Sequence, residues 1–114
     1  MENRHPFKSS IIILCFLLSL SSVSCAKINS VWLSATAGSA LDKGQYDKAI
    51  TKYEKLTELN PDEYSNYWNL GVAYARQHKY SEAQKQVVKL QKVGKDDLAN
   101  ELKNAITDQK SQSK

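Results

Sequence analysis

The stretch Asn66–Ala83, NYWNLGVAYARQHKYSEA, places its largest and smallest side chains at regular intervals. Tyr67 and Tyr74 are seven residues apart, which puts both on one face of a helix. Gly71 and Ala83 stand among the large residues, one on each side of a short polar turn. Small residues in these places let two helices approach closely, whereas a leucine would force them apart. The stretch therefore predicts a tightly packed pair of helices, with the aromatic side chains filling the space beside the contacts.

The same helical rhythm continues in both directions, and no segment after residue 26 alternates as a strand does. Asn60–Pro61 ends one helix, because the residue before a proline is pushed out of helical geometry. Gly94 is placed to end another helix, and Asp96 or Asp97 is expected to cap the last one. The sequence predicts an all-α fold with helices at about residues 28–43, 46–59, 64–77, 81–93 and 97–107. The polar tail 108–114 has nothing to bury and is expected to be disordered.

Apolar spacing also predicts which side chains of these helices face the core. On the second helix the predicted inward residues are Ala49, Ile50, Tyr53, Leu56 and Leu59. On the last helix they are Leu98, Leu102, Ala105 and Ile106.

Residues 1–26 differ in composition from the rest of the chain. A basic start is followed by the apolar run Ile11–Leu20 and then by the small residues of SSVSCA. This order is typical of a secretory signal peptide, and the run is shorter than the about 20 residues that cross a bilayer. We expect residues 1–26 to be such a signal peptide, with an uncleaved anchor as the alternative.

Two cleavage sites are open in this segment. Ser24 and Ala26 are small residues where a signal peptidase reads, so cleavage after Ala26 would release a secreted or periplasmic domain. The tetrapeptide SVSC also resembles a bacterial lipobox, in which Cys25 would be lipidated and become the first residue; Ser22 stands where the lipobox usually has leucine. Acyl chains on Cys25 would give a membrane-anchored lipoprotein.

Charge and cysteine content exclude several classes of function. The chain has a net charge of +4, with lysines and acids interspersed. It has no run of five like charges, which argues against nucleic acid binding. No cysteine follows Cys25, so the exported domain has no disulfide, no cysteine-bound zinc and no thiol nucleophile.

The sequence repeats with a period of 34 residues. Among the residues that recur at this distance are Tyr46 as Tyr80, Ala49 as Ala83 and Leu56 as Leu90. A period of 34 residues, built from two helices and a turn, is typical of helical repeat proteins.

The second unit resembles a tetratricopeptide repeat (TPR). The residues that match the family pattern are Asn69, Leu70, Gly71, Tyr74, Tyr80, Ala83 and Leu90. The first unit matches in its second half, at Gly44, Tyr46, Ala49, Tyr53, Leu59 and Pro61. Its first helix departs from the pattern, with Leu33, Thr36 and Ala37 where the family has Trp, Leu and Gly. The resemblance implies a TPR-like domain at 27–107, with helical hairpin units at about 30–63 and 64–96 and a capping helix at 97–107.

The resemblance also implies where a partner would bind. The first helices of TPR units line the concave face of the array, which here would include Trp68, Asn69, Val72 and Arg76, with Leu41 from the first unit. Trp68, Val72 and Arg76 are spaced i, i+4, i+8 and form one stripe of the composition seen at binding hot spots. The alternative is a structural role for Trp68, under the N-terminal segment or against a second copy.

Catalysis has almost no support in the sequence. His78 falls in a turn without a nucleophile spaced to it, Asp96–Asp97 is explained by a helix cap, and the scattered glycines form no phosphate loop. We expect no enzyme activity, no cofactor and no metal.

The expected function is a non-catalytic scaffold of the cell envelope or secretory space that binds a protein or peptide. A self-associating module that stacks through its open helical ends is the alternative. An enzyme active only within a complex is a third hypothesis, which no residue supports.

Overall fold

The computed structural model describes residues 27–114. The predicted signal peptide and the predicted lipidation site Cys25 lie outside these residues. The chain divides into two compact units, Met1–Val31 and Trp32–Lys114, and the architecture below is that of the larger unit. Within residues 27–114, no helix is both long enough and apolar enough to cross a bilayer.

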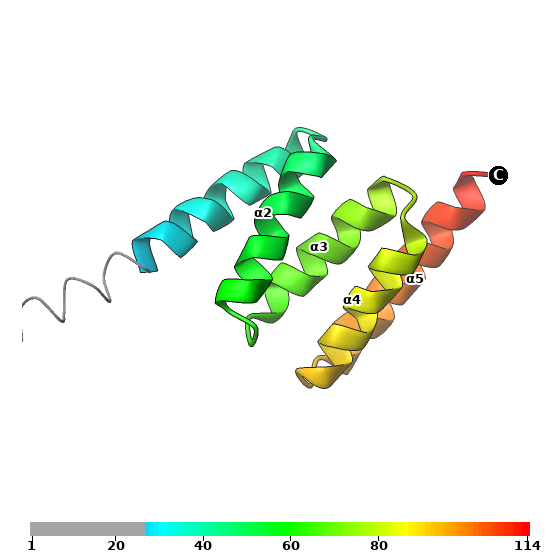
Figure 1. The fold of residues 1–114 in the computed structure, drawn as a ribbon. Coiled ribbons are helices and arrows are strands. Elements are labelled where there is room, and N and C mark those ends of the chain that lie inside the picture. Colours follow the sequence, from blue (N-terminus) through cyan, green and yellow to red (C-terminus); the bar gives the residue numbers. More distant parts are fainter. Residues whose placement is uncertain (1–26) are drawn as a thin grey trace, which may run out of the picture. The chain divides into compact units, whose positions relative to one another are not determined.

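The described chain is helical, and residues 27–114 contain no strand. A first helix covers residues 27–42. It is followed by α2 (Tyr46–Leu59), α3 (Tyr64–Arg76), α4 (Tyr80–Lys92) and α5 (Asp96–Gln112) (Figure 1). These bounds confirm the predicted all-α fold and agree with the predicted helices to within a residue or so, except at the end of α5.

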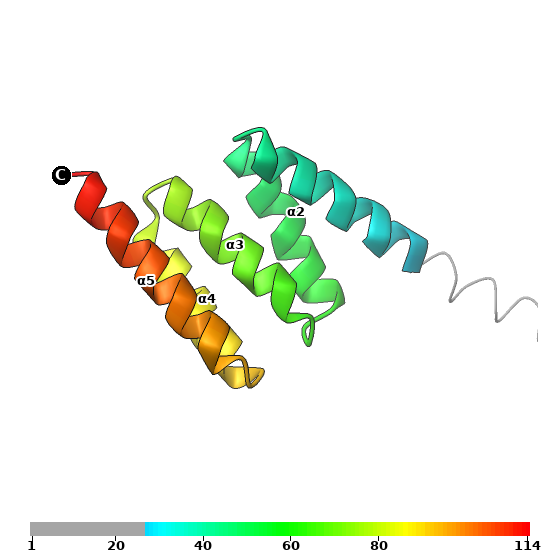
Figure 2. The same ribbon diagram turned by 180° about the vertical axis from the view of Figure 1, so that it is seen from behind.

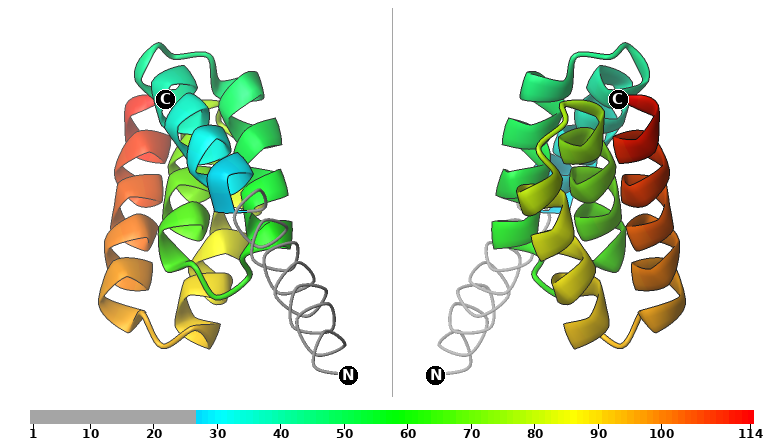
Figure 3. Two further views of the ribbon diagram at one scale, coloured as in Figure 1. Left: turned by 90° about the vertical axis from the view of Figure 1, so that its left-hand side faces the viewer. Right: turned by 90° about the vertical axis from the view of Figure 1, so that its right-hand side faces the viewer.

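The helices of the larger unit alternate between two layers. α2 and α4 lie in front in Figure 1, whereas α3, α5 and the part of the first helix from Trp32 onward lie in front in the reverse view of Figure 2. The two side views in Figure 3 show the same separation. α3 is central, because it packs against α2, α4 and α5. This alternation is that of stacked helical hairpins, as the repeat period predicts.

Side chains from every helix of the larger unit form one core. Leu56, Leu90 and Leu102 are its largest fully buried members. Most of the predicted inward residues are buried, but two predictions were wrong. Leu59 is 51% exposed, because it is the last residue of α2 and the chain turns away there. On α5, Ala99 is buried and Ala105 is exposed, since the buried face runs through Leu102 and Ile106.

The ends of α5 also differ from the prediction. Lys95 occupies the N-cap position without a side-chain hydrogen bond, and Asp96 and Asp97 lie in the first turn. In the first turn their negative charges interact favourably with the positive end of the helix dipole. This interaction does not require a hydrogen bond at the N-cap. The helix continues to Gln112, so residues 108–112 are not disordered. Once Ile106 holds the helix in place, each further polar residue adds a backbone hydrogen bond without a new nucleation cost.

The hairpin turns require residues in the left-handed backbone region. Gly44 and Gly94 have φ of 71° and 75°, and His78 has φ of 60°. His78 lies 34 positions after Gly44, so the second unit uses histidine where the first uses glycine. Its Nδ1 lies 2.8 Å from the Tyr80 hydroxyl in the same turn. His78 is therefore a turn residue, as the sequence predicts.

Gly71 lies where three helices meet. A Cβ atom on Gly71 would be 2.5 Å from Cδ2 of Leu102 on α5 and 3.3 Å from Cβ of Gln86 on α4. The sequence explains the small residue by close approach of α3 and α4 alone. The structure shows that a methyl group of Leu102 on α5 comes closer still, so Gly71 also makes room for the contact between α3 and α5.

We predict that Gly71→Ala lowers the free energy of unfolding by about 1–3 kcal/mol, because the new methyl group overpacks a filled site. The direction is informative, since glycine to alanine inside a helix ordinarily stabilises by about 1 kcal/mol. Urea unfolding of the wild type, Gly71→Ala, Leu102→Ala and the double variant would measure the effect. Gly71→Ala should cost less in the Leu102→Ala background; equal costs in both backgrounds would contradict the contact.

Candidate functional site

The helix α3 presents two opposite faces. At 100° per residue, Tyr67, Leu70 and Tyr74 share one face, and Trp68, Val72 and Arg76 share the face opposite to it. Tyr67, Leu70 and Tyr74 are buried or nearly so, as expected from their place in the repeat. The two faces meet different surroundings and are described separately.

Trp68, Val72 and Arg76 form what we call the α3 stripe. Trp68 and Val72 are half-buried and pack against the core, whereas Arg76 is exposed. Asn69 beside them is half-buried, and Leu41 is half-buried against the core at the end of the first helix. Trp68 is thus partly a structural residue and partly open to a partner. Binding by these five residues stays a prediction.

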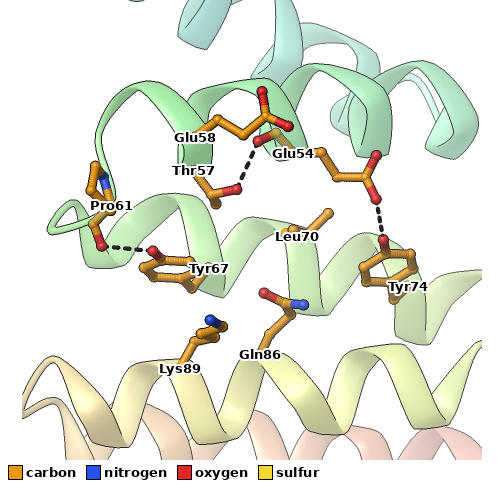
Figure 4. Close-up of a pocket in the computed structure, with 9 residues that line it drawn as sticks. All are labelled: Glu54, Thr57, Glu58, Pro61, Tyr67, Leu70, Tyr74, Gln86 and Lys89. Atoms are coloured by element: carbon orange, nitrogen blue, oxygen red, sulfur yellow. Dashed lines mark hydrogen bonds between the residues drawn. The ribbon is translucent and has the colours of Figure 1, made fainter.

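A second surface, the α2–α4 groove, lies over the other face of α3 (Figure 4). It has a volume of about 580 Å³ and is open to solvent. Its lining comes from α2 and the turn after it (Glu54, Thr57, Glu58, Pro61), from α3 (Tyr67, Leu70, Tyr74) and from α4 (Gln86, Lys89). The sequence assigns the two tyrosines to core packing and does not predict the groove. The sequence contains part of the signal for this groove, because Glu54 and Glu58 are spaced i, i+4 and therefore share one face of α2.

Both groove tyrosines are fixed by hydrogen bonds of their hydroxyl groups. Tyr67 donates to the carbonyl oxygen of Pro61 at 2.6 Å, and Tyr74 donates to Oε1 of Glu54 at 2.5 Å (Figure 4). Burial and, to a smaller extent, the charge of Asp62 raise the pKa of Tyr67. Burial, followed by the hydrogen bond and the charge of Glu54, raises the pKa of Tyr74 well above its usual range. Both rings are therefore neutral, rigid parts of the groove.

We predict that Tyr74→Phe lowers the free energy of unfolding at neutral pH by about 1 kcal/mol, through the lost hydrogen bond. Because the folded state raises the pKa of Tyr74, the folded protein binds more protons than the unfolded chain above pH of about 10, and wild-type stability falls there. The variant lacks this loss, so the difference in stability should shrink as pH rises. Urea midpoints measured from neutral to alkaline pH would test this; a constant difference would contradict it.

Residues 27–114 contain no group of three or more His, Cys, Asp or Glu side chains that could hold a metal ion. At an exposed turn, His78 contacts the Tyr80 hydroxyl. The same hydroxyl lies 3.3 Å from Oγ of Ser113. Such a chain of contacts links the turn to the end of α5 and needs no chemical role.

Comparison with known proteins gives one match. A family model described as TPR repeat matches residues 40–77, which cover α2 and α3. No curated protein and no solved structure gives a significant match. TPR repeats generally mediate protein–protein interactions, and the family generally serves as a non-catalytic scaffold. The match and the alternating helical layers together show that this chain has an all-α fold of the TPR type.

Proposed function

We propose that the chain is a non-catalytic scaffold of the cell envelope or secretory space that holds a protein or peptide on the α3 stripe. Asn69 and Leu41 would extend the contact on either side. The proposal rests mainly on the partial burial of Trp68 and Val72. Both side chains pack against the core, and Arg76 beside them is exposed. Side chains held in this way lose little freedom on binding, and Trp and Arg are enriched at hot spots.

The composition of residues 1–26 supports the proposed location. A signal peptide would export the domain, and lipidation of Cys25 would anchor it to a membrane as a periplasmic or envelope lipoprotein. Cleavage after Ala26 would leave a secreted or periplasmic protein instead. Intact mass of the mature protein distinguishes the two, because the first product begins with an acylated Cys25 and the second with Lys27.

The partner-binding role is tested by crosslinking and pull-down from the native host. We predict that Trp68→Ala/Arg76→Glu loses partners that the wild type captures, because the anchor and its neighbouring charge are both removed. The matched control is Val88→Ala/Lys92→Glu on α4, since both of its residues are exposed and lie on the other layer. Arg76→Glu alone removes no buried group and guards against loss of folding. Equal capture by the stripe variant and the control would contradict the role of the stripe.

Self-association is the second candidate, and the exposure of Trp32 favours it. Trp32 begins the larger unit and is 70% exposed. At the other end of the array, α5 presents Asp97, Glu101 and Asp108 to solvent, which is the polar outer face of a capping element. If the apolar end at Trp32 pairs only with the same end of a second copy, the result is a closed two-fold dimer and not a filament.

We predict that, if this pairing occurs, light scattering finds a dimer that Trp32→Ser converts to a monomer without change in helix content. Asp97→Asn serves as the control, because it alters the opposite end of the array. A wild-type protein that remains monomeric as its concentration is raised would sink the self-association candidate.

A further inference from the structure

We propose that the α2–α4 groove is a second binding site, which takes an extended segment of a partner protein with cationic side chains at alternate positions and an acidic side chain between them. The groove shares no residue with the α3 stripe and lies on the other face of α3. A partner could therefore be held on both layers, or two partners could be held at once. The success or failure of this proposal is independent of the stripe.

The floor of the groove is apolar and preorganised. Leu70 lies between Tyr67 and Tyr74 along α3, and both tyrosine hydroxyls are already bonded to α2 or to the turn after it (Figure 4). Less than a tenth of each of these side chains is exposed, and the part that a bound segment would meet is already ordered, which lowers the entropic cost of binding. The volume of about 580 Å³ lies in the range of about 300–1,000 Å³ that is usual for ligand pockets, which suits a short segment.

The α2 wall carries two carboxylates at a spacing that an extended chain can match. Glu54 and Glu58 are four residues apart on a helix, a rise of about 6 Å. Side chains two residues apart on an extended chain are about 6.6 Å apart and point to the same side. Two cationic side chains in an i, i+2 arrangement would thus match the spacing of these two residues along α2, provided that the exposed Glu58 side chain turns from Lys55 toward the groove.

Existing contacts of these carboxylates leave room for a ligand. Glu58 pairs with Lys55 at 3.3 Å, but the two side chains are 69% and 59% exposed, so the pair contributes little and can be replaced. Glu54 accepts a hydrogen bond from Tyr74 through Oε1, and Glu54 is an exposed residue. A carboxylate has acceptor sites to spare for a second donor.

The α4 wall has the opposite charge. Lys89 and Gln86 face the groove from this side (Figure 4). The middle side chain of an extended segment points away from the α2 wall and toward α4, because successive side chains alternate. An acidic side chain there would meet Lys89. Mixed charge also suits a chain of net charge +4, which would repel a purely cationic partner at a distance.

The proposal is tested with two peptides of identical composition. The probe is acetyl-Gly-Ser-Arg-Glu-Arg-Ser-Gly-amide, and the control is acetyl-Gly-Ser-Arg-Arg-Glu-Ser-Gly-amide, in which the charges no longer face their walls. We expect titration calorimetry at low salt to find the probe bound roughly fivefold more tightly or better, since several exposed ion pairs add together. No measurable binding of the probe, or equal binding of the two peptides, would overturn the proposal.

Charge variants of the protein locate the site. Glu54→Gln/Glu58→Gln should abolish the preference for the probe, and the new amide at position 54 still has an oxygen that can accept from Tyr74. Glu101→Gln/Asp108→Asn changes the net charge equally on exposed residues of α5 and should keep the preference. Binding outside the groove would be shown by either of two results. The Glu54→Gln/Glu58→Gln protein would still prefer the probe, or both double variants would lose the preference equally.

A third variant protects the test against loss of folding. Lys89→Glu should weaken the probe and strengthen a peptide whose central residue is lysine, acetyl-Gly-Ser-Arg-Lys-Arg-Ser-Gly-amide. A reversal of this kind cannot come from unfolding. An unchanged order of affinities in a folded Lys89→Glu protein would contradict the assignment of the α4 wall.

Discussion

The missing side chain of Gly71 is the constraint on which the arrangement of the helices depends. At this position α3 has no atom beyond its backbone, and Leu102 of α5 and Gln86 of α4 fill the space. Leu102 is fully buried, and with Ile106 it supplies much of the apolar surface that α5 adds to the core. Burying one such leucine stabilises a fold by about 1.5–3 kcal/mol. A short helical array has few neighbouring helices among which to bury apolar surface, so the close contact of α5 with α3 adds to its single core.

This packing also explains why α3 offers two different surfaces. Its sides are covered by α2, α4 and α5, so two opposite faces lie outside these contacts, one with half-buried and exposed side chains and one whose side chains are almost fully buried. On one face, Trp68 and Val72 rest against the core and lead to the exposed Arg76. On the other, Tyr67 and Tyr74 form the floor of a groove whose walls are α2 and α4. These are the two surfaces that we propose as binding sites.

Much of this fold could be predicted from the sequence, because its turns and period carry strong local signals. Asn60–Pro61, Gly94 and the recurrence of Tyr46 as Tyr80 locate the helices to within a residue or so. The errors occur where local signals are weak. The exposure of Leu59 depends on how the chain leaves α2, and the extent of α5 depends on a helix already held elsewhere. The groove was not predicted, because it arises from the separation of α2 and α4. The sequence pattern of a single helix does not show how far that helix lies from another.

Hydrogen exchange of the full chain, followed by mass spectrometry, tests the central claim most directly. If α5 closes the core through Leu102 and Gly71, amides in the middle of α5 should be as protected as those of α3. Both sets should lose protection together as denaturant is added, because they open in one cooperative unit. Rapid exchange throughout α5, while α3 and α4 remain protected, would contradict the claim and show that the two repeat units are stable without a cap.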